Sequence, residues 1–377
     1  MNKVLFVATV VKTHIMEFHI PYLKMFKEMG WETAVAAKND YENPADCAIP
    51  YCDTYYDIPF ERNPLKPGNL KAYNKLKKVI DDGGYDIIHC HTPVGAMLTR
   101  IAAKQARTNG TKVFYTAHGF HFYKGAPVIN WLLYYPVEKW LSRYTDVLIT
   151  INKEDYERAK TFKAGKVCYV PGVGIDLKKF QTSKELHKLK REWLCTEFCI
   201  PKDTTILLSV GEVNKNKNHR VVIEALGKLK RKDIFYLICG RGPLQDEYKT
   251  LANQLNIGKQ VVLAGYRTDV ADFYKAADVF VFPSFREGLP VSVMEAMASG
   301  LPVIATCIRG SSDIVKEKNN GVLLKPDDVE GFANAIDAFR NADLIESISK
   351  MNANEAMKYD LDAVIKLYQR VYFGEGE

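Results

Sequence analysis

Two glutamates near residue 290 have a spacing that could bind a ligand rich in hydroxyls and phosphates. Glu287 and Glu295 are separated by seven residues, and Pro290 between them favours the start of a helix. Backbone N–H groups at Gly288 and Leu289 would then lie at the positive end of that helix, which binds anions such as a pyrophosphate. Ionised carboxylates accept hydrogen bonds and pair well with hydroxyls. The alternative, two solvated acids, is disfavoured because Glu295 interrupts the apolar run Val-Met-Glu-Ala-Met-Ala.

Several histidines in the first half of the chain are candidates for chemistry, and each has a structural alternative. His118 follows an apolar run and could be a core or turn residue as well as a site residue. His14 and His19, with Glu17, follow the first apolar run and could meet a substrate or form one polar helix face. His89 and His91 would point the same way on a strand, but no third ligand is close in sequence, which favours packing over a metal site.

Short β-branched runs alternate with amphipathic helical patterns, which is typical of parallel sheets built from βαβ units. The first series of expected strands is 4–8, 33–37, 86–90, 112–116, 146–151 and 166–170, and the second is 205–210, 234–239, 260–263, 279–282, 302–305 and 321–323. Expected helices include 69–82, 130–143, 219–231 and 244–255. In open α/β sheets ligands bind at the carboxyl ends of the strands, so the sites are expected there.

A turn and a charged segment near the middle of the chain predict two domains. The turn Pro-Gly-Val-Gly at 171–174 follows a strand, and a charged, helix-prone segment at 183–197 precedes the second strand series. We expect an amino-terminal domain at 1–170, a hinge at 171–204, a carboxyl-terminal domain at 205–355 and a final helix at 356–377 that packs back on the first domain. A length of 377 residues suits two domains of ordinary size.

Composition and charge exclude several classes of protein. Hydrophobic residues make up 47% of the chain and charged residues 26%, which excludes disorder and collagen-like sequence. Residues 1–180 hold 25 Lys+Arg and 18 Asp+Glu, so they carry the whole net charge of +7. This excess is either chance or a sign of an anionic partner, such as lipid headgroups or a diphosphate. The eight cysteines lack paired metal spacing, and no nucleic-acid-binding motif is present.

The segment EGLPVSVMEAMASGLPVIAT resembles the E-x7-E signature of retaining glycosyltransferases of family 4. Further segments match that family in order along nearly the whole chain. They are the loop SVGEVNKNK at 209–217, the turn CGRGPL at 239–244, the loop AGYRTDV at 264–270 and the turn TAHG at 116–119. The E-x7-E block is specific, and the others gain weight from their order. The resemblance implies the GT-B fold, in which two Rossmann-like, doubly wound parallel-sheet domains face a central cleft.

The resemblance also implies roles for individual residues. Glu287 would bind hydroxyls of the transferred sugar and Glu295 the ribose, while Lys217 would neutralise the diphosphate. His118 would reach the reaction centre and act with Glu287 in catalysis. The implied donor site comprises Gly211, Lys217, Arg267, Glu287, Gly288, Leu289 and Glu295. Apart from the resemblance, we expect His14, His19 and His91 on the acceptor side. No metal or other cofactor is expected, because Lys217 and backbone dipoles would replace a cation.

Two features depart from the family pattern. Glu212 stands where the family commonly has an arginine, so either neighbouring lysines compensate or its carboxylate points away from the diphosphate. The usual amino-terminal glycine-rich loop is replaced by TVVKTHI at 9–15, which leaves the acceptor side undefined.

The acceptor partner is expected to be lipid-linked, as in similar bacterial transferases of exopolysaccharide or capsule assembly. The aromatic and basic segment 120–135 is either core or an interfacial patch, and the lysine-rich helix with Lys71, Lys75, Lys77 and Lys78 is a solvated face or part of the same basic surface. No apolar stretch approaches the roughly 20 residues of a spanning helix, so the expected location is cytoplasmic, with peripheral attachment to the inner membrane face.

The sequence thus predicts an enzyme that moves a hexose or N-acetylhexosamine from a nucleoside-diphosphate sugar, expected to be a UDP-sugar, with retention of anomeric configuration. Two alternatives stay open: a GT-B-shaped nucleotide-sugar 2-epimerase, and a non-catalytic two-lobed sugar- or nucleotide-binding protein. A nicotinamide dehydrogenase is disfavoured, because no G-x-G-x-x-G follows the first strand.

Overall fold

A computed structural model describes residues 1–316 and 320–374 of the chain. The chain divides into two compact units, each with its own sheet and core. Unit 1 contains residues 1–173 together with residues 364–374, and unit 2 contains residues 174–363.

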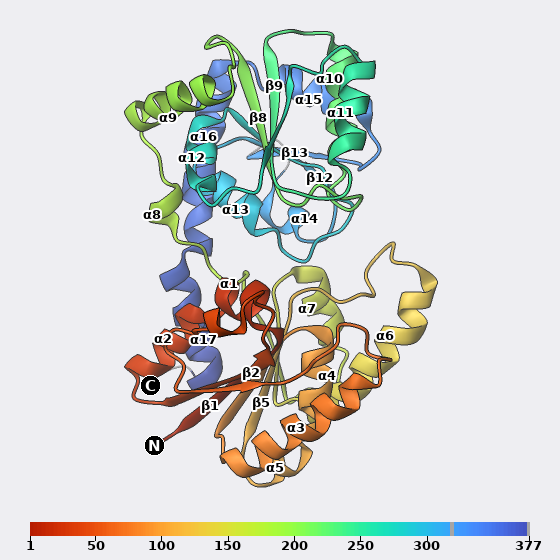
Figure 1. The fold of residues 1–377 in the computed structure, drawn as a ribbon, viewed down its shortest axis with the longest axis vertical. Helices are drawn as coiled ribbons and strands as arrows, with labels where there is room; N and C mark the ends of the chain where they lie inside the picture. Colours follow the sequence, from red (N-terminus) through yellow and green to blue (C-terminus); the bar gives the residue numbers. More distant parts are fainter. Residues whose placement is uncertain (317–319, 375–377) are drawn as a thin grey trace. The chain divides into compact units, whose positions relative to one another are not determined.

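Unit 1 is built on a seven-stranded parallel sheet with the strand order β3-β2-β1-β4-β5-β6-β7 (Figure 1). The strands are β1 (Lys3–Val10), β2 (Glu32–Lys38), β3 (Thr54–Asp57), β4 (Ile87–Cys90), β5 (Lys112–Ala117), β6 (Val147–Thr150) and β7 (Lys166–Tyr169). The order reverses between β1 and β4, which is the switch point where doubly wound sheets bind ligands.

Helices cover both faces of this sheet, because its central strand is apolar on both sides. Leu5 and Val7 of β1 pack in one core with α3 (Gly68–Gly83), α4 (Pro93–Ala102), α6 (Val128–Leu141) and α7 (Lys153–Ala159). Val4 and Phe6 pack in the other core with α2 (Ile20–Glu28) and with Val364, Tyr368 and Tyr372 of the carboxyl-terminal helix α17 (Leu361–Phe373). Short elements complete the unit: the π-helical turn η1 (Val11–Ile15), α1 (Met16–Phe18), η2 (Pro44–Asp46), α5 (Lys104–Thr108) and η3 (Ser142–Tyr144).

Unit 2 has a six-stranded parallel sheet with the order β10-β9-β8-β11-β12-β13. The strands are β8 (Thr205–Val210), β9 (Ile234–Cys239), β10 (Val261–Gly265), β11 (Val279–Phe282), β12 (Val303–Thr306) and β13 (Gly321–Leu324). Strands β8 and β11 are hydrogen-bonded neighbours, with Val279 aligned with Leu207. The order reverses between them, so the carboxyl ends of β8 and β11 form the second switch point.

The helices of unit 2 also form two layers (Figure 1). One core joins the sheet to α10 (His219–Leu229), α11 (Gln245–Gln254) and α15 (Val329–Ala338). The remaining elements are α8 (Leu177–Phe180), α9 (Lys184–Glu197), α12 (Val270–Ala276), α13 (Val291–Ala298), α14 (Ser311–Ile314), α16 (Ala342–Ala356) and η4 (Met357–Tyr359).

The two predicted series of parallel strands are confirmed, with ends that shift by up to two residues. The edge strand β3 was not predicted from the sequence, because Thr54, Tyr55 and Tyr56 are only partly buried and Asp57 is exposed, so they give no long apolar run. The π-helical turn η1, which directly follows β1, was not predicted either.

Candidate donor site and histidine cluster

Lys217 and Glu287 form an ion pair at the switch point of unit 2. Lys217 follows β8 and Glu287 follows β11, and the Lys217 Nζ atom lies 2.8 Å from Glu287 Oε1. The two side chains are 21% and 20% exposed, so the pair is shielded yet reachable. The structure therefore brings together the predicted phosphate-binding lysine and the predicted sugar-binding glutamate.

Hydrogen bonds hold the two loops that carry this pair against each other. Asn216 donates through Nδ2 to Glu287 Oε1 at 3.3 Å and to the carbonyl of Arg286 at 3.0 Å. The backbone N–H of Phe285 donates to the carbonyl of Asn216 at 2.8 Å. Because both loops are fixed by Asn216, the ammonium and the carboxylate have defined positions before any ligand binds.

Glycines allow the backbone to approach closely around the pair. A Cβ atom at Gly211 would lie 3.1 Å from Lys217 Cε, and one at Gly240 would lie 1.8 Å from the carbonyl oxygen of Gly211. Gly310 has a φ of +84°, and a Cβ there would lie 2.1 Å from the carbonyl oxygen of Gly288. These positions exclude larger residues on steric grounds, so the loop before α13 has its shape only with glycine at 310.

The amino end of α13 lies directly after Gly288 and Leu289, as the sequence predicts. The helix begins at Val291, and its cap residue Pro290 makes no side-chain hydrogen bond to the first N–H groups. Arg309 donates through Nε to the carbonyl of Glu287 at 3.3 Å. Uncapped N–H groups and the helix dipole make this end suitable for a diphosphate.

Glu295 occupies a different environment from Glu287. Its Oε2 accepts a hydrogen bond from the hydroxyl of Tyr274 at 2.9 Å. Burial raises the pKa of the Glu295 carboxyl, while the Tyr274 hydroxyl and the nearby charge of Lys179 act in the opposite direction. One oxygen is thus held by Tyr274, and the carboxylate can offer its other acceptor to a ligand hydroxyl.

Arg267, a predicted donor-site residue, and Glu212, which departs from the family pattern, both have hydrogen-bond partners within unit 2. Arg267 donates to both carboxylate oxygens of Asp269, at 2.8 and 2.6 Å, and pairs with Glu197 at 2.9 Å. Its role toward the donor stays a prediction. Glu212 accepts from Asn214 Nδ2 at 2.6 Å, which is one way to keep its carboxylate occupied beside Lys217.

Four histidines of unit 1 meet at the carboxyl edge of its sheet. His14 lies in η1 after β1, His19 directly precedes α2, His91 follows β4 and His118 follows β5. One ligand-capable atom from each lies within 4.8 Å of those of the others. We refer to His14, His19, His91 and His118 as the histidine cluster. The structure therefore groups all the predicted acceptor-side residues with the histidine predicted to be catalytic.

Burial keeps the imidazoles of the histidine cluster neutral. Desolvation, with a smaller contribution from His118, lowers the pKa of His14 to about 3. Desolvation alone lowers the pKa of His118 to about 4, and it lowers those of His19 and His91 well below the ordinary value. His89 lies outside the cluster, because its ring nitrogens are bonded to Tyr372 and to Thr116. The metal-like pair of His89 and His91 is thus divided between a core role and the cluster.

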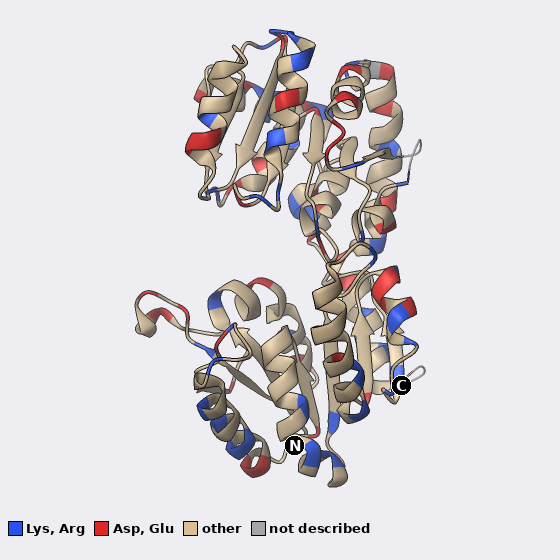
Figure 2. Ribbon diagram, turned by 90° about the vertical axis from the view of Figure 1, so that its right-hand side faces the viewer, with Lys and Arg blue, Asp and Glu red and all other residues tan. Residues whose placement is uncertain are grey.

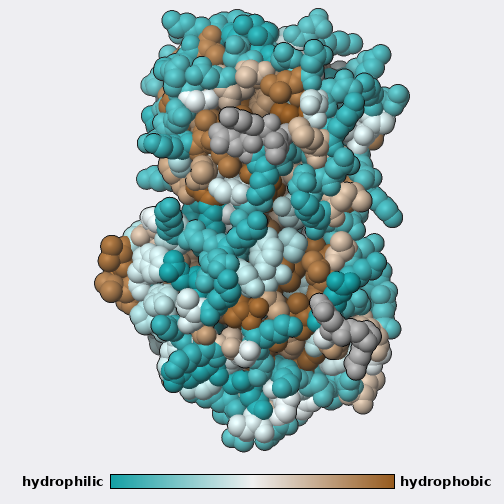
Figure 3. All heavy atoms as spheres, turned by 180° about the vertical axis from the view of Figure 1, so that it is seen from behind, coloured by the Kyte–Doolittle hydropathy of each residue, from teal (hydrophilic) through white to brown (hydrophobic). Residues whose placement is uncertain are grey.

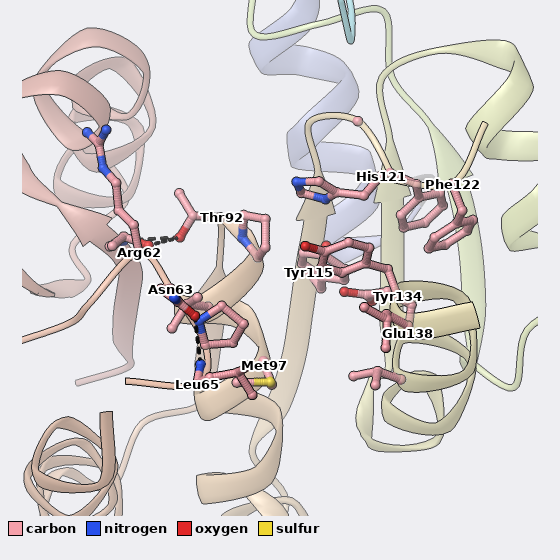
Figure 4. Close-up of a pocket in the computed structure, with 18 of the residues that line it drawn as sticks. Arg62, Asn63, Leu65, Thr92, Met97, Tyr115, His121, Phe122, Tyr134 and Glu138 are labelled. Atoms are coloured by element: carbon pink, nitrogen blue, oxygen red, sulfur yellow. Dashed lines mark hydrogen bonds between the residues drawn. The ribbon is translucent and has the colours of Figure 1, made fainter. Parts of the chain in front are cut away.

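A pocket of about 710 Å³ opens beside the cluster in unit 1 (Figure 4). It shares His14 with the cluster, and apolar side chains such as Met97, Tyr115, Phe122 and Tyr134 form much of its wall. Its polar lining includes Arg62, Asn63, Thr92, His121 and Glu138. Apolar walls with a few polar groups are typical of small-molecule sites.

The floor of this pocket is fixed by a buried ion pair. Arg100, which is 1% exposed, donates to both carboxylate oxygens of Glu138 at 2.9 and 3.1 Å. Its guanidinium also lies 4.1 Å from the ring centroid of Tyr115. A bidentate pair over an aromatic ring holds both pocket residues rigidly.

Sequence reasoning missed several residues that support these sites. Asn216 belongs to a segment quoted for the resemblance, but its bond to Glu287 had no signal in the sequence. Tyr274 and Arg309 are distant in sequence from the residues they contact. Arg100 and Glu138 each look like ordinary charges on amphipathic helices, and only the fold shows that they pair.

Comparisons with known proteins agree with this fold. Residues 196–357 match the family described as Glycosyl transferases group 1, and residues 3–152 match the family described as Glycosyl transferase 4-like. The chain is 42% identical to EpsD of Bacillus subtilis (strain 168), which is named as a glycosyltransferase, over 98% of this chain and 96% of that protein.

Two further relatives and one solved structure are similar over much of the chain. An Escherichia coli protein named UDP-Gal:alpha-D-GlcNAc-diphosphoundecaprenol alpha-1,3-galactosyltransferase is 29% identical, over 76% of this chain and 74% of that protein. A Campylobacter jejuni protein named N,N'-diacetylbacillosaminyl-diphospho-undecaprenol alpha-1,3-N-acetylgalactosaminyltransferase is 26% identical, over 95% of each. The fold of Anabaena Alr3699/HepE, solved with UDP and glucose, superposes with a TM-score of 0.80 at 18% identity over 99% of each chain. This chain therefore belongs to the group 1 and family 4-like glycosyltransferases, has the GT-B fold and is a hexosyltransferase of polysaccharide biosynthesis.

Proposed function

We propose that this enzyme transfers a hexose or N-acetylhexosamine from a UDP-sugar to a lipid-linked saccharide acceptor, with retention of anomeric configuration, in exopolysaccharide or capsule assembly. The observation that carries the donor side of this proposal is the Lys217–Glu287 pair beside the amino end of α13. The names of two relatives include a diphosphoundecaprenol acceptor, and both of those names specify an alpha-1,3 linkage.

The diphosphate of the donor requires positive charge and N–H donors, whereas the hydroxyls of its sugar and ribose require hydrogen-bond acceptors. The diphosphate carries negative charge that grows as the leaving group departs, and the Lys217 ammonium and the N–H groups at Gly288 and Leu289 stabilise it. Glu287 accepts hydrogen bonds from hydroxyls of the transferred sugar, and Glu295 accepts from the ribose. Gly211 leaves room beside Lys217, and Arg267 lies near the base.

The reaction would proceed on one face of the sugar. No residue of the donor site is placed as a covalent nucleophile, so we propose an oxocarbenium-like transition state in which a donor phosphate oxygen accepts the acceptor's proton. His118 contributes to this reaction centre, as the family resemblance implies. The charge on the leaving diphosphate is met by Lys217 and the α13 dipole, so we propose that transfer needs no metal, and activity should persist after chelation with EDTA.

The acceptor side is proposed to combine the pocket of unit 1 with attachment to a membrane surface. Among residues 1–316 and 320–374, no helix has both the length and the apolar composition to cross a bilayer. Helix α6 nevertheless exposes a run of apolar side chains, and a brown apolar patch protrudes over this helix (Figure 3). The exposed residues are Val128, Ile129, Leu132, Leu133, Val137 and Trp140.

Charge in unit 1 is a weaker argument for the membrane than this apolar helix. Lys and Arg are interspersed with Asp and Glu over the helices (Figure 2). In α3, Lys77 pairs with Asp81 at 2.6 Å and Lys78 with Asp82 at 3.8 Å, as on an ordinary solvated face. The membrane proposal therefore rests on α6, where aromatic and aliphatic residues suit the interfacial region.

The membrane proposal is tested by co-sedimentation with anionic liposomes. Leu132→Ser should reduce binding severalfold, while Leu189→Ser in α9, a comparably exposed leucine of unit 2, should leave it unchanged. Equal binding of both variants would reject α6 as the attachment surface.

The transfer reaction is tested with a panel of radiolabelled UDP-α-sugars and a diphosphoundecaprenol-linked saccharide. We expect one donor to give an α-linked product, with the anomeric configuration read by NMR. A β-linked product would overturn retention, a 2-epimerised nucleotide sugar would identify an epimerase, and binding without turnover would identify a binding protein. Glu287→Gln should lose transfer with an unchanged melting temperature.

A further inference from the structure

The histidine cluster has an unusual composition for the interior of a protein domain. His19 and His91 are 2% and 1% exposed, and their ring centroids lie 3.9 Å apart. His118 Nε2 lies 3.4 Å from His91 Nδ1, and the ring of His14 lies 5.0 Å from that of His19. In the part of the chain that the structure describes, this is the group of side chains whose spacing suits a metal ion.

Four of the eight ring nitrogens in the cluster are buried without a hydrogen-bond partner. Both nitrogens of His19 are buried without one, and so are Nε2 of His14 and Nε2 of His91. Buried polar atoms are nearly always paired, and an unpaired one needs an explanation. His89 shows the contrast, because its two nitrogens are bonded to Tyr372 and Thr116. One ring nitrogen from each of the four histidines lies within 4.8 Å of those of the other three.

We propose that the histidine cluster binds one divalent transition-metal ion of the zinc class, with His14, His19, His91 and His118 as its ligands. Four imidazoles and no carboxylate form a nitrogen donor set, which suits Zn²⁺, Co²⁺ or Ni²⁺ and not Mg²⁺ or Ca²⁺. Neutral imidazole is the form that coordinates metals, and the ion would occupy the lone pairs that are unpaired in the structure.

The geometry is close to that of a tetrahedral site but open. A Zn–N distance of about 2.0–2.1 Å places the four nitrogens of a tetrahedron about 3.3 Å apart. The four ligand atoms span up to 4.8 Å, so the imidazoles would move closer together to close a tetrahedron around an ion.

All four candidate ligands lie in unit 1, and the proposal does not rest on the proposed function. The ion would take up the lone pair of His118, the residue also proposed for the reaction centre. Zinc would then inhibit transfer without being required for it. A failed metal test would leave the proposed transfer intact, and a failed transfer test would leave metal binding intact.

The test uses the full chain without a histidine tag, stripped with a chelator and titrated with Co²⁺. We expect one Co²⁺ per chain with the strong visible absorption of four-coordinate cobalt, displaced by Zn²⁺ at equal stoichiometry. His19→Asn and His91→Asn should each weaken Co²⁺ binding at least tenfold. His187→Asn, a partly exposed histidine of unit 2 bonded to the Lys275 carbonyl, should bind like the unchanged chain.

The metal-binding measurement on the unchanged chain is by itself enough to reject the proposal. The test therefore does not depend on whether the histidine variants fold. Absence of stoichiometric Co²⁺ and Zn²⁺ binding would reject the site, as would an octahedral cobalt spectrum. Binding that His19→Asn and His91→Asn leave undiminished would place the metal elsewhere. If the stripped chain binds pyrophosphate at the cluster and no metal, the unpaired nitrogens serve an anion and the inference is wrong.

Discussion

Replacing Lys217 with alanine should weaken UDP binding about 30–150-fold, which corresponds to about 2–3 kcal/mol. The ammonium is about four-fifths shielded from solvent and lies 2.8 Å from Glu287. In such a setting a charge-assisted hydrogen bond to a phosphate contributes at the upper end of its usual range. Removal of the ammonium also leaves the Glu287 carboxylate without its cation beside the diphosphate, which adds repulsion.

A double-mutant cycle separates these two effects. Glu287→Gln removes the carboxylate charge but keeps the shape, so UDP should bind equally well or more tightly while sugar transfer is lost. In the Glu287→Gln background, Lys217→Ala should then cost less than it does in the unchanged chain, because no unpaired carboxylate remains. The difference between the two costs measures the coupling of the pair.

Isothermal titration calorimetry with UDP and the preferred UDP-sugar measures these affinities. Lys215→Ala is the matched control, since Lys215 is an exposed lysine of the same loop. It should change the dissociation constant less than about threefold, the scale of a screened surface charge. Equal effects of Lys215→Ala and Lys217→Ala, or a twofold effect of Lys217→Ala, would refute the assignment of Lys217 as the phosphate ligand.

Three further predictions follow from buried or crowded positions. Burial raises the pKa of the folded-state Glu295 carboxyl above 4.5, so ionisation of Glu295 should destabilise the unchanged chain as pH rises from about 4.5 through that raised pKa. Glu295→Gln lacks this ionisation, so its unfolding free energy should gain on that of the unchanged chain over the same pH range. A difference between the two unfolding free energies that does not vary with pH in chemical denaturation would contradict this. Gly310→Ala should destabilise unit 2 and weaken UDP binding, while Gly84→Ala, which shares a positive φ but has open space, should cost only about 1 kcal/mol; equal losses would contradict the steric argument. Arg100→Met should cost about 3 kcal/mol because it leaves the Glu138 carboxylate unpaired, and Arg100→Met with Glu138→Leu should recover much of that loss; no recovery would show that Arg100 acts through packing alone.

The fold could be predicted largely from the sequence, because buried parallel strands read as continuous apolar runs. Val4–Ala8 is fully buried on both faces of the sheet, and it stands out without any alignment. The edge strand β3 could not be found this way, since Thr54, Tyr55 and Tyr56 are only partly buried. The strand order of each sheet shows where the order reverses, and both candidate sites lie at these switch points.

The donor site could be predicted better than its supports. Lys217 and Glu287 are 70 residues apart, and their pairing follows from the neighbouring positions of β8 and β11. The hydrogen bond from Tyr274 to Glu295 depends on how α12 packs against α13, which periodicity does not specify.

The histidine cluster shows the opposite limit. His14, His19, His91 and His118 were each singled out from the sequence, but nothing in the sequence showed that all four side chains meet in one cluster. Short spacing within one strand directed attention to His89 and His91, whereas the structure selects one residue after each of β4 and β5 and two after β1. Clusters assembled from several strand ends are visible only once the strand order is known.

A crystal structure of the chain soaked with its preferred UDP-sugar would test the central claim most directly. We expect the diphosphate within hydrogen-bonding distance of Lys217 Nζ and the first N–H groups of α13, with Glu287 on the sugar and Glu295 on the ribose. A diphosphate bound in the pocket of unit 1, or a sugar nucleotide that leaves the Lys217–Glu287 pair untouched, would contradict it.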